Sequence, residues 1–323
     1  MEIKEPLLPL GEDNGNQKAG VLCLANEARF TSSNYSEPLT TFGVGFREKE
    51  NLQAELDAIA TPVPVGRRFE FKAANNADEF LSEADDIRAI GAPFKRIESK
   101  GTSVNQKTHN KGLTVRLDRD EDLIVPGAEE RAVGRIITRL YRNDLRRGYA
   151  LLVAAATNTA KTWDGTSGKD PDQDVMTDLD TGGDARGFDS NMVVYGRTAW
   201  LKRLLAHRAQ TVAGGVASSA IISPEELAAF LGVDKVLITK SRYQSTSSAK
   251  SKNIGGAYVL MYFNSQSNDK DDASNIKRFY TPTESGMFRV YREEHAKFVD
   301  VSVEHYSNLV ITSSLGIRMF TIS

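Results

Sequence analysis

The sequence is poor in several features that mark whole classes of protein. Only one of its 323 residues, Cys23, is a cysteine, which excludes an intrachain disulfide framework and a thiolate metal cluster. It has no apolar run of about 18 residues that could span a bilayer. Its first residues, MEIKEPLLPLGED, lack the basic start and apolar core of a secretory signal. We therefore expect a soluble protein made in a reducing cytoplasm, with no membrane partner.

A net charge of one sign is also nearly absent. The 41 lysines and arginines stand against 43 aspartates and glutamates, which gives a formal charge of -2. A dedicated nucleic-acid binder would need a large excess of basic residues for its duplex affinity, so any contact with nucleic acid must be local. The apolar content of 40% and charged content of 26% are those of ordinary globular proteins, and the length allows two domains or one large body with insertions.

Motifs for catalysis and nucleotide binding are missing as well. Neither G-x-S-x-G nor H-E-x-x-H occurs, and no histidine has a visible catalytic partner along the sequence. The four histidines are His109, His207, His295 and His305. The segment 101–108, GTSVNQKT, has Gln106 where a phosphate-binding loop needs its second glycine. The sequence therefore predicts no catalytic residue and no cofactor.

An acidic, glycine-rich segment is the nearest approach to a metal site. Asp170, Asp172 and Asp174 have the spacing of a calcium loop, but Val175 takes the place of the required glycine and no glutamate closes the loop. We interpret residues 162–189 as a solvated acidic loop with one short helix after Pro171, and predict no metal. A hydrolase that uses Asp170 to Asp180 with a bound cation stays a third-ranked alternative.

One long helical pattern is the most prominent positive feature. Pro126 stands where a helix start tolerates proline, two glutamates follow in the first turn, and the pattern continues to Asn158. Roughly 30 residues at about 1.5 Å each would make a rod of about 45 Å. At 100° per residue one side of this spine helix is apolar. Its residues are Val133, Ile136, Ile137, Leu140 and Leu151.

The opposite side of the spine helix is a stripe of five arginines, which we call the arginine face. They are Arg131, Arg135, Arg139, Arg142 and Arg146. The face is either solvated or meets an acidic partner, such as another protein surface or packaged nucleic acid. The helix alone does not decide between these readings. Asp144 interrupts the apolar side, where we expect it to pair with a neighbouring cation.

The segments before the spine helix predict an arm and a long hairpin. Residues 1–45 have no sustained period and indicate an extended arm, followed by a short helix at 48–59 that buries Leu52, Leu56 and Ile59. The stretch TPVPVGRRFEFK predicts a strand with one apolar face. It opens a polar excursion that ends in an alternating run at 113–117. Such an excursion buries little in its own domain, so we expect it to lie on a neighbouring subunit.

The segments after the spine helix alternate between helices and strands. Met192 to Tyr195 predicts a buried strand, and the helix 197–207 is expected to bury Trp200, Leu201, Leu204 and Leu205. A flexible connector at 213–222 leads to a helix capped by Ser223 and ended by Gly232. The remaining runs predict strands at 235–239 and 257–263, then an antiparallel meander at 288–290, 298–303, 309–311 and 317–322.

Four stretches carry a resemblance to a known family. They are TPVPVGRRFEFK with its excursion; the arginine-rich helix ending LLVAAATNTAKTW; NMVVYGRTAWLKRLLAH with SPEELAAFLGVDKVLITKSRY and GGAYVLMYF; and FRVYREEHAKFVDVSVEHYSNLVITSSLGIRMF. In their order and texture they resemble the major capsid proteins of tailed phages, which share the Hong Kong phage-type shell fold. The resemblance covers roughly residues 55–323.

The resemblance implies an α+β architecture with named parts. A peripheral domain, of spine helix and antiparallel sheet, would comprise residues 46–65, 119–165 and 286–323. Residues 66–118 would be the extended loop, 166–285 an axial domain of mixed sheet with flanking helices, and 1–45 the N-terminal arm. Arg67 and Arg68 join the five spine arginines as candidate inter-subunit or interior contacts.

The same resemblance implies a function and partners. Subunits of this family form hexamers and pentamers that close into an icosahedral shell around double-stranded DNA, so a virion location and assembly in the host cytoplasm are expected. The arm is too short for a scaffolding extension, which implies a separate scaffolding protein beside the portal protein, with a decoration protein left open. An encapsulin-like bacterial nanocompartment shell that encloses cargo enzymes is the alternative from another class.

Overall fold

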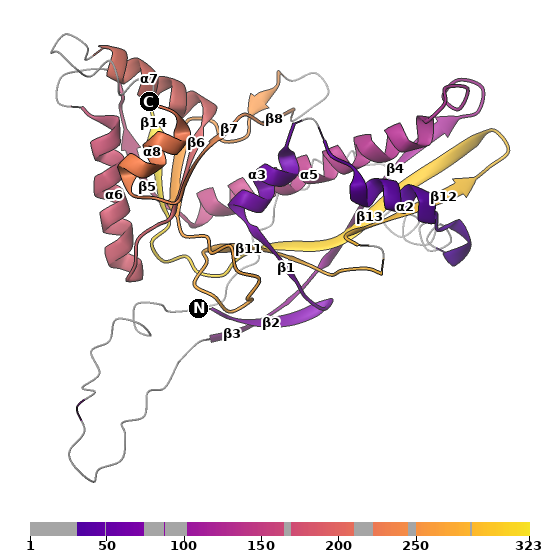
Figure 1. The fold of residues 1–323 in the computed structure, drawn as a ribbon, viewed down its shortest axis with the longest axis horizontal. Helices are drawn as coiled ribbons and strands as arrows, with labels where there is room; N and C mark the ends of the chain where they lie inside the picture. The colour runs from indigo at the N-terminus through magenta and orange to yellow at the C-terminus, as the bar shows by residue number, and fades with distance from the viewer. Residues whose placement is uncertain are drawn as a thin grey trace, which may run out of the picture.

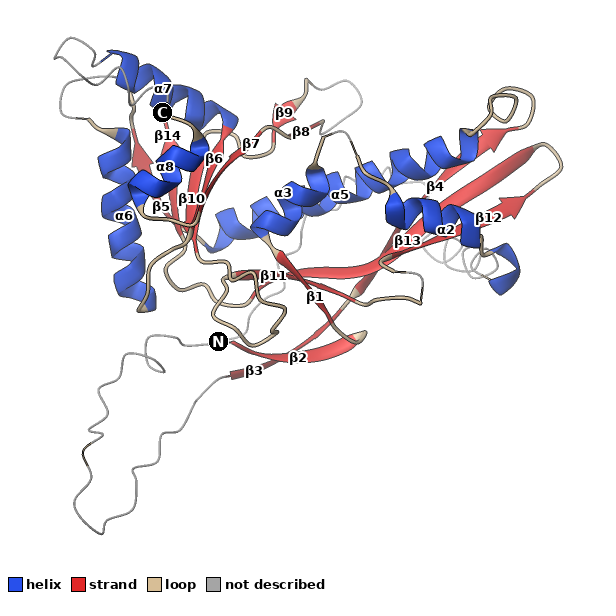
Figure 2. Ribbon diagram, viewed as in Figure 1, coloured by secondary structure: helices blue, strands red, loops and turns tan. Residues whose placement is uncertain are grey.

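The structure is a computed structural model that describes residues 31–48, 50–73, 87, 102–164, 169–209, 222–244, 250–284 and 286–323. Helices and strands are mixed along the chain, which confirms the α+β class (Figure 2). The helices are η1 (Ser32–Asn34), α2 (Glu37–Gly45), α3 (Leu52–Ile59), α5 (Ala128–Ala155), α6 (Pro171–Arg186), α7 (Arg197–Ala209) and α8 (Pro224–Leu231). The strands are β1 (Thr61–Pro64), β2 (Arg68–Ala73), β3 (Thr102–Lys107), β4 (His109–Asp118), β5 (Thr157–Lys161), β6 (Met192–Gly196), β7 (Lys235–Thr239), β8 (Arg242–Tyr243), β9 (Lys252–Asn253), β10 (Tyr258–Tyr262), β11 (Ile276–Tyr280), β12 (Phe288–Glu294), β13 (Phe298–Ile311) and β14 (Arg318–Ile322).

The first sheet is built around β13, a strand of 14 residues. β12, β4 and β11 all pair with it antiparallel, and β1 lies parallel to β11. The predicted runs at 298–303 and 309–311 are therefore one strand. Residues 109–118, which the sequence analysis placed in the extended loop, form β4 and belong to this sheet.

The spine helix, α5, packs against the first sheet along β13 and β4 and is flanked by α2 and α3 (Figure 1). It has 28 residues and begins at Ala128, after Gly127 with a φ of 74°. That left-handed conformation suits glycine, so the helix starts two residues later than the sequence pattern predicted. It also ends earlier, because Thr157 already belongs to β5, where its N–H donates to the carbonyl of Ile317.

The second sheet has the order β5-β14-β10-β6-β7 and mixes parallel with antiparallel pairs. Its central strands are buried on both faces. On β6, Val194 packs with the core around α5, whereas Val193 packs with the core beneath α6, α7 and α8. The last strand, β14, pairs with β5 and β10 in this sheet, so the predicted C-terminal meander is wrong in its last member.

A small two-stranded hairpin of β2 and β3 stands apart from both sheets (Figure 1). It is anchored by aromatic packing, since the ring centroids of Phe69 and Phe279 are 4.4 Å apart and Phe71 is 2% exposed. Most of the polar excursion between the two strands lies outside the described residues, as do residues 1–30 and 213–221.

Three expectations about local structure were wrong. Residues 37–45 of the expected arm form helix α2, whose Leu39 is buried and whose Thr40 accepts the backbone N–H of Val290. The expected acidic loop is mostly helical: a helix does follow Asp170, its N-cap, as expected, but α6 has 16 residues and is not short. In α7, Trp200 is buried as expected, but Leu201 and Leu205 are 53% and 51% exposed. Only one side of this helix packs on the sheet, so Leu201 and Leu205, which lie outside the packed side, are exposed.

Other local predictions are confirmed. Leu52, Leu56 and Ile59 of α3 are fully buried. Ser223 and Glu226 form a capping box at the start of α8, and Gly232 ends that helix with a φ of 70°. Among the described residues, none of the helices combines the length and apolar character needed to cross a bilayer.

Candidate inter-subunit surfaces

The two sides of the spine helix differ in burial as the sequence predicted. Val133, Ile136 and Ile137 are at most 1% exposed against the first sheet. On the other side four arginines of the arginine face are exposed and Arg142 is half-buried. The helix therefore presents a row of positive charge on the side that the sheet leaves open.

Contacts within the chain engage only part of the arginine face. Arg142 pairs with Glu50 at 2.7 Å, Arg131 donates to the carbonyl of Pro126 at 2.9 Å, and the Arg146 guanidinium lies 4.8 Å from the centroid of the Tyr243 ring. Arg135 and Arg139 make no hydrogen bond or ion pair with the residues that the structure describes. The charge in the middle of the face is thus not neutralised by the part of the chain that the structure describes.

A second concentration of positive charge lines a hollow at the base of the hairpin. Arg67, Arg68, Lys107 and Thr108 surround a volume of about 400 Å³, which we call the basic hollow. The Arg67 guanidinium is held 4.3 Å from the centroid of the Tyr306 ring, and Thr108 is fixed by a 2.8 Å contact to the Thr281 hydroxyl. All three cationic side chains are exposed, and none has an ion pair with another described residue.

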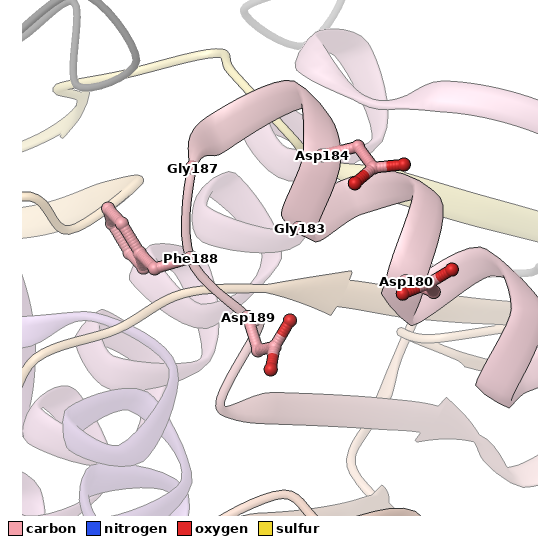
Figure 3. Close-up of a pocket in the computed structure, with 6 residues that line it drawn as sticks. All are labelled: Asp180, Gly183, Asp184, Gly187, Phe188 and Asp189. Atoms are coloured by element: carbon pink, nitrogen blue, oxygen red, sulfur yellow. The ribbon is translucent and has the colours of Figure 1, made fainter. Parts of the chain in front are cut away.

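An acidic hollow of about 250 Å³ lies at the C-terminal end of α6 (Figure 3). Asp180 and Asp184 project from successive turns of the helix, and Asp189 approaches from the segment that follows it. Gly187 ends the helix with a φ of 97°, a conformation that suits glycine. The buried Arg186 beside Asp189 partly offsets the charge. Burial lowers the pKa of Arg186 to about 10, so it stays cationic at neutral pH.

The buried carboxylate in the spine helix finds its cation on β4. Asp144 is 1% exposed, and its Oδ1 accepts from Lys111 at 2.7 Å and from Arg147 at 2.8 Å. Its Oδ2 lies 3.3 Å from His305 Nε2 and accepts from Ser307 at 3.2 Å. Burial alone would raise the pKa of Asp144, but Lys111 and His305 outweigh it and hold the pKa well below its ordinary value. The expected pairing is confirmed.

A comparable cluster joins α6 to α7. Asp172 accepts two hydrogen bonds from Arg203, both 2.7 Å, and lies 3.2 Å from His207 Nε2. Burial would raise its pKa, but the hydrogen bonds from His207 and Arg203 outweigh that effect and lower it. Sequence reasoning missed this cluster, because it joins residues about 30 positions apart. The only local signal was the four-residue spacing of Arg203 and His207, which places them on one side of a helix.

These contacts bear on the cation site considered from the sequence. Asp170, Asp172 and His207 bring ligand atoms within 4.8 Å of one another. However, both oxygens of Asp172 face the guanidinium of Arg203, and Asp174 binds Lys161 and the indole N–H of Trp163. A metal ion would have to displace a buried bidentate arginine, so this cluster fits an internal ion pair better than a metal site.

Comparison with solved structures identifies proteins of similar fold. A phage-related protein from Bordetella bronchiseptica RB50 matches with a TM-score of 0.64 at 13% identity, over 88% of this chain and 96% of the other. A structure from Gordonia phage Cozz matches with a TM-score of 0.52 at 11% identity, over 96% and 98%. A chain from the mature capsid of bacteriophage PhiM1 follows with a TM-score of 0.48 at 9% identity, over 86% and 89%. The chain has the phage capsid fold. No family model and no curated protein matches the sequence.

Within the capsid fold, the predicted contact residues fall into two separate groups. The five spine arginines lie along α5, whereas Arg67 and Arg68 lie at the start of β2 and line the basic hollow. Sequence reasoning missed Lys107 as a third member of that hollow. It follows Arg67 and Arg68 by about 40 residues, and only the antiparallel pairing of β2 with β3 brings them together.

Proposed function

We propose that this chain is a major capsid protein that self-assembles as hexamers and pentamers into an icosahedral shell around phage double-stranded DNA. The observation that carries the proposal is the capsid fold over most of the chain. Arg135 and Arg139 of the arginine face, which have no ion pair with a described residue, and the basic hollow support it, because a subunit of a closed shell needs surfaces for its neighbours and its contents. The role is structural rather than catalytic, and the chain resides in the virion after assembly in the host cytoplasm.

We propose the division into parts with the boundaries given above, except that residues 109–118, which form β4 of the first sheet, belong with the spine helix and not with the extended loop. The peripheral domain would carry the spine helix, and the extended loop would lie on an adjacent subunit. A separate scaffolding protein, the portal protein and, where present, a decoration protein would be the further partners.

The first test is assembly itself. The chain should be expressed alone and together with its scaffolding protein, sedimented, and viewed by electron microscopy. Closed particles that contain DNA after packaging support the proposal. Only monomers under every condition would remove it, and small DNA-free particles holding a guest enzyme would favour the nanocompartment alternative.

The arginine face offers a sharper test of how the shell meets its contents. From Arg131 to Arg146 it extends about 22 Å at about 1.5 Å per residue, and exposed arginines of this kind contribute to duplex affinity by releasing counterions. Arg139 has no partner among the described residues, so Arg139→Glu should leave the fold intact while lowering particle yield or DNA content. Arg242→Glu, an exposed change on β8, is the matched control. Equal yield and DNA content in both variants would count against a contact role for the arginine face.

The hydrolase alternative is tested separately. The ion pair of Asp172 with Arg203 predicts that Asp172→Ala lowers stability rather than abolishing an activity. A stoichiometric metal ion found by elemental analysis, lost together with a hydrolytic activity in that variant, would contradict the structural assignment.

A further inference from the structure

The two ends of strand β4 carry opposite charge. Arg67, Arg68 and Lys107 of the basic hollow lie next to its first residue, His109. The strand has 10 residues, which at about 3.3 Å each separate its ends by about 33 Å. At the far end the chain leaves the strand in the acidic segment 118–122, DRDED, which we call the acidic turn.

The acidic turn is exposed and holds its shape by backbone contacts. The Asp118 carboxylate accepts the N–H of Asp120 at 2.8 Å, and the Asp122 carboxylate accepts the N–H of Asp118 at 3.0 Å. All four of its carboxylates are exposed, and none forms an ion pair within the part of the chain that the structure describes. The one cation of the turn, Arg119, is engaged by Glu294. The turn therefore carries net negative charge that the described part of the chain leaves unneutralised.

Shape separates the acidic turn from the acidic hollow at the end of α6. The connection from β4 to α5 projects at the upper right end of the molecule (Figure 1), and Ile124 beside it is 71% exposed. The acidic surface at the end of α6 is instead a hollow. A hollow cannot fit into the basic hollow, whereas a projecting turn can. The acidic turn is thus complementary to the basic hollow in both charge and shape, whereas the acidic hollow is complementary in charge alone.

We propose that the acidic turn of one copy of this chain docks in the basic hollow of the next copy. The inference rests on the proposed function, in which copies of the chain assemble. Because the two surfaces lie at opposite ends of one strand, the contact is head-to-tail, and its repetition generates a ring where the rotation closes. Each copy carries both an acidic turn and a basic hollow of opposite charge. The partner that we propose for the hollow is therefore a second copy of the chain.

Charge reversal on each side tests the contact. Arg67→Glu with Arg68→Glu places acids in the hollow, and Asp120→Lys with Glu121→Lys places cations on the turn. Neither the Asp120 nor the Glu121 side chain makes a hydrogen bond with a described residue, so both double variants should fold. Each should raise the protein concentration required for assembly at least about tenfold, because like charges would meet across the interface. The control, Lys235→Glu with Lys240→Glu, alters two exposed lysines near β7 and should assemble as the natural chain does.

The decisive arm combines the two reversals in one chain. That fourfold variant meets its neighbours with opposite charges again and should recover assembly to within about threefold of the natural chain. Normal assembly of both double variants would overturn the inference. So would a fourfold variant that is folded by circular dichroism but no better at assembly than either double variant. A hollow variant that assembles normally and loses only packaged DNA would assign the basic hollow to nucleic acid and also overturn it. Failure of the natural chain to assemble would instead remove the proposed function, so the two failures are distinguishable.

Discussion

The buried ion pair between the spine helix and the first sheet gives a prediction with a definite sign. Asp144 is 1% exposed and accepts from Lys111 at 2.7 Å, and the Lys111 side chain is 13% exposed. Replacing Asp144 with Asn keeps the shape and the hydrogen bond from Ser307 but leaves the Lys111 ammonium without its nearest counter-charge. Breaking a buried pair in this way costs about 3–5 kcal/mol, because the remaining charge is uncompensated.

Replacing Lys111 with Met should cost less, about 1–3 kcal/mol, since Arg147 still lies 2.8 Å from the carboxylate and is 37% exposed to water. The double variant removes both charges. It should therefore be more stable than Asp144→Asn alone by at least about 2 kcal/mol, which means that the second substitution rescues the first.

The assay is urea unfolding of the unassembled chain at pH 7.5, monitored by far-ultraviolet circular dichroism, with sedimentation to verify the absence of particles. The four chains form a double-mutant cycle. The double variant could instead be less stable than Asp144→Asn, with a loss in unfolding free energy equal, to within about 0.5 kcal/mol, to the sum of the two single losses. Asp144 and Lys111 would then not be coupled energetically. The account of how α5 is held on β4 would then be wrong.

Three further predictions concern other parts of the chain. Ile137→Asp should prevent folding or assembly, because Ile137 is 1% exposed and losing its packing while burying a charge should cost more than about 4 kcal/mol; a soluble variant with an unchanged urea midpoint would contradict this. Gly196→Ala should destabilise by about 1–3 kcal/mol, because its added Cβ would lie 2.3 Å from the carbonyl oxygens of Gly255 and Gly256, whereas Gly45→Ala, which meets nothing within 4 Å, should be neutral or slightly stabilising in the same unfolding assay. Burial lowers the pKa of His305 below its ordinary 6.5, so the unfolded chain takes up a proton that the folded chain refuses: stability should be full above about pH 6.5 and fall below it by at most about 1.4 kcal/mol per pH unit. His305→Gln should flatten this slope between pH 7 and 5.5, and an unchanged slope would show that His305 is not its source.

The spine helix shows how much local pattern determined. Its amphipathic division was legible because apolar side chains recur at helical spacing, and burial of Val133, Ile136 and Ile137 confirms it. Capping residues likewise placed the start and end of α8. The boundaries of the spine helix were predicted less accurately, because Gly127 adopts a left-handed conformation before the helix begins and Thr157 belongs to strand β5. These are effects of backbone geometry and of distant partners.

Strand pairing was beyond the reach of local pattern. Alternation predicted strands near 113–117, 298–303 and 317–322 but could not tell which sheet each would join. β4 joined the first sheet through β13, and β14 joined the second through β5 and β10. A strand has two edges of similar hydrogen-bonding capacity, and its partner is chosen by contacts far along the chain.

For the candidate surfaces, the sequence by itself determined that the spine helix has a basic side, that Arg67 and Arg68 stand together, and that Asp144 needs a cation. The tertiary structure alone decided that this cation is Lys111, that Lys107 completes the basic hollow, and that Asp172 is neutralised by Arg203. The physical reason is range. Helical periodicity and capping act over a few residues, whereas a buried charge or a surface hollow is completed by side chains that only the folded backbone brings together.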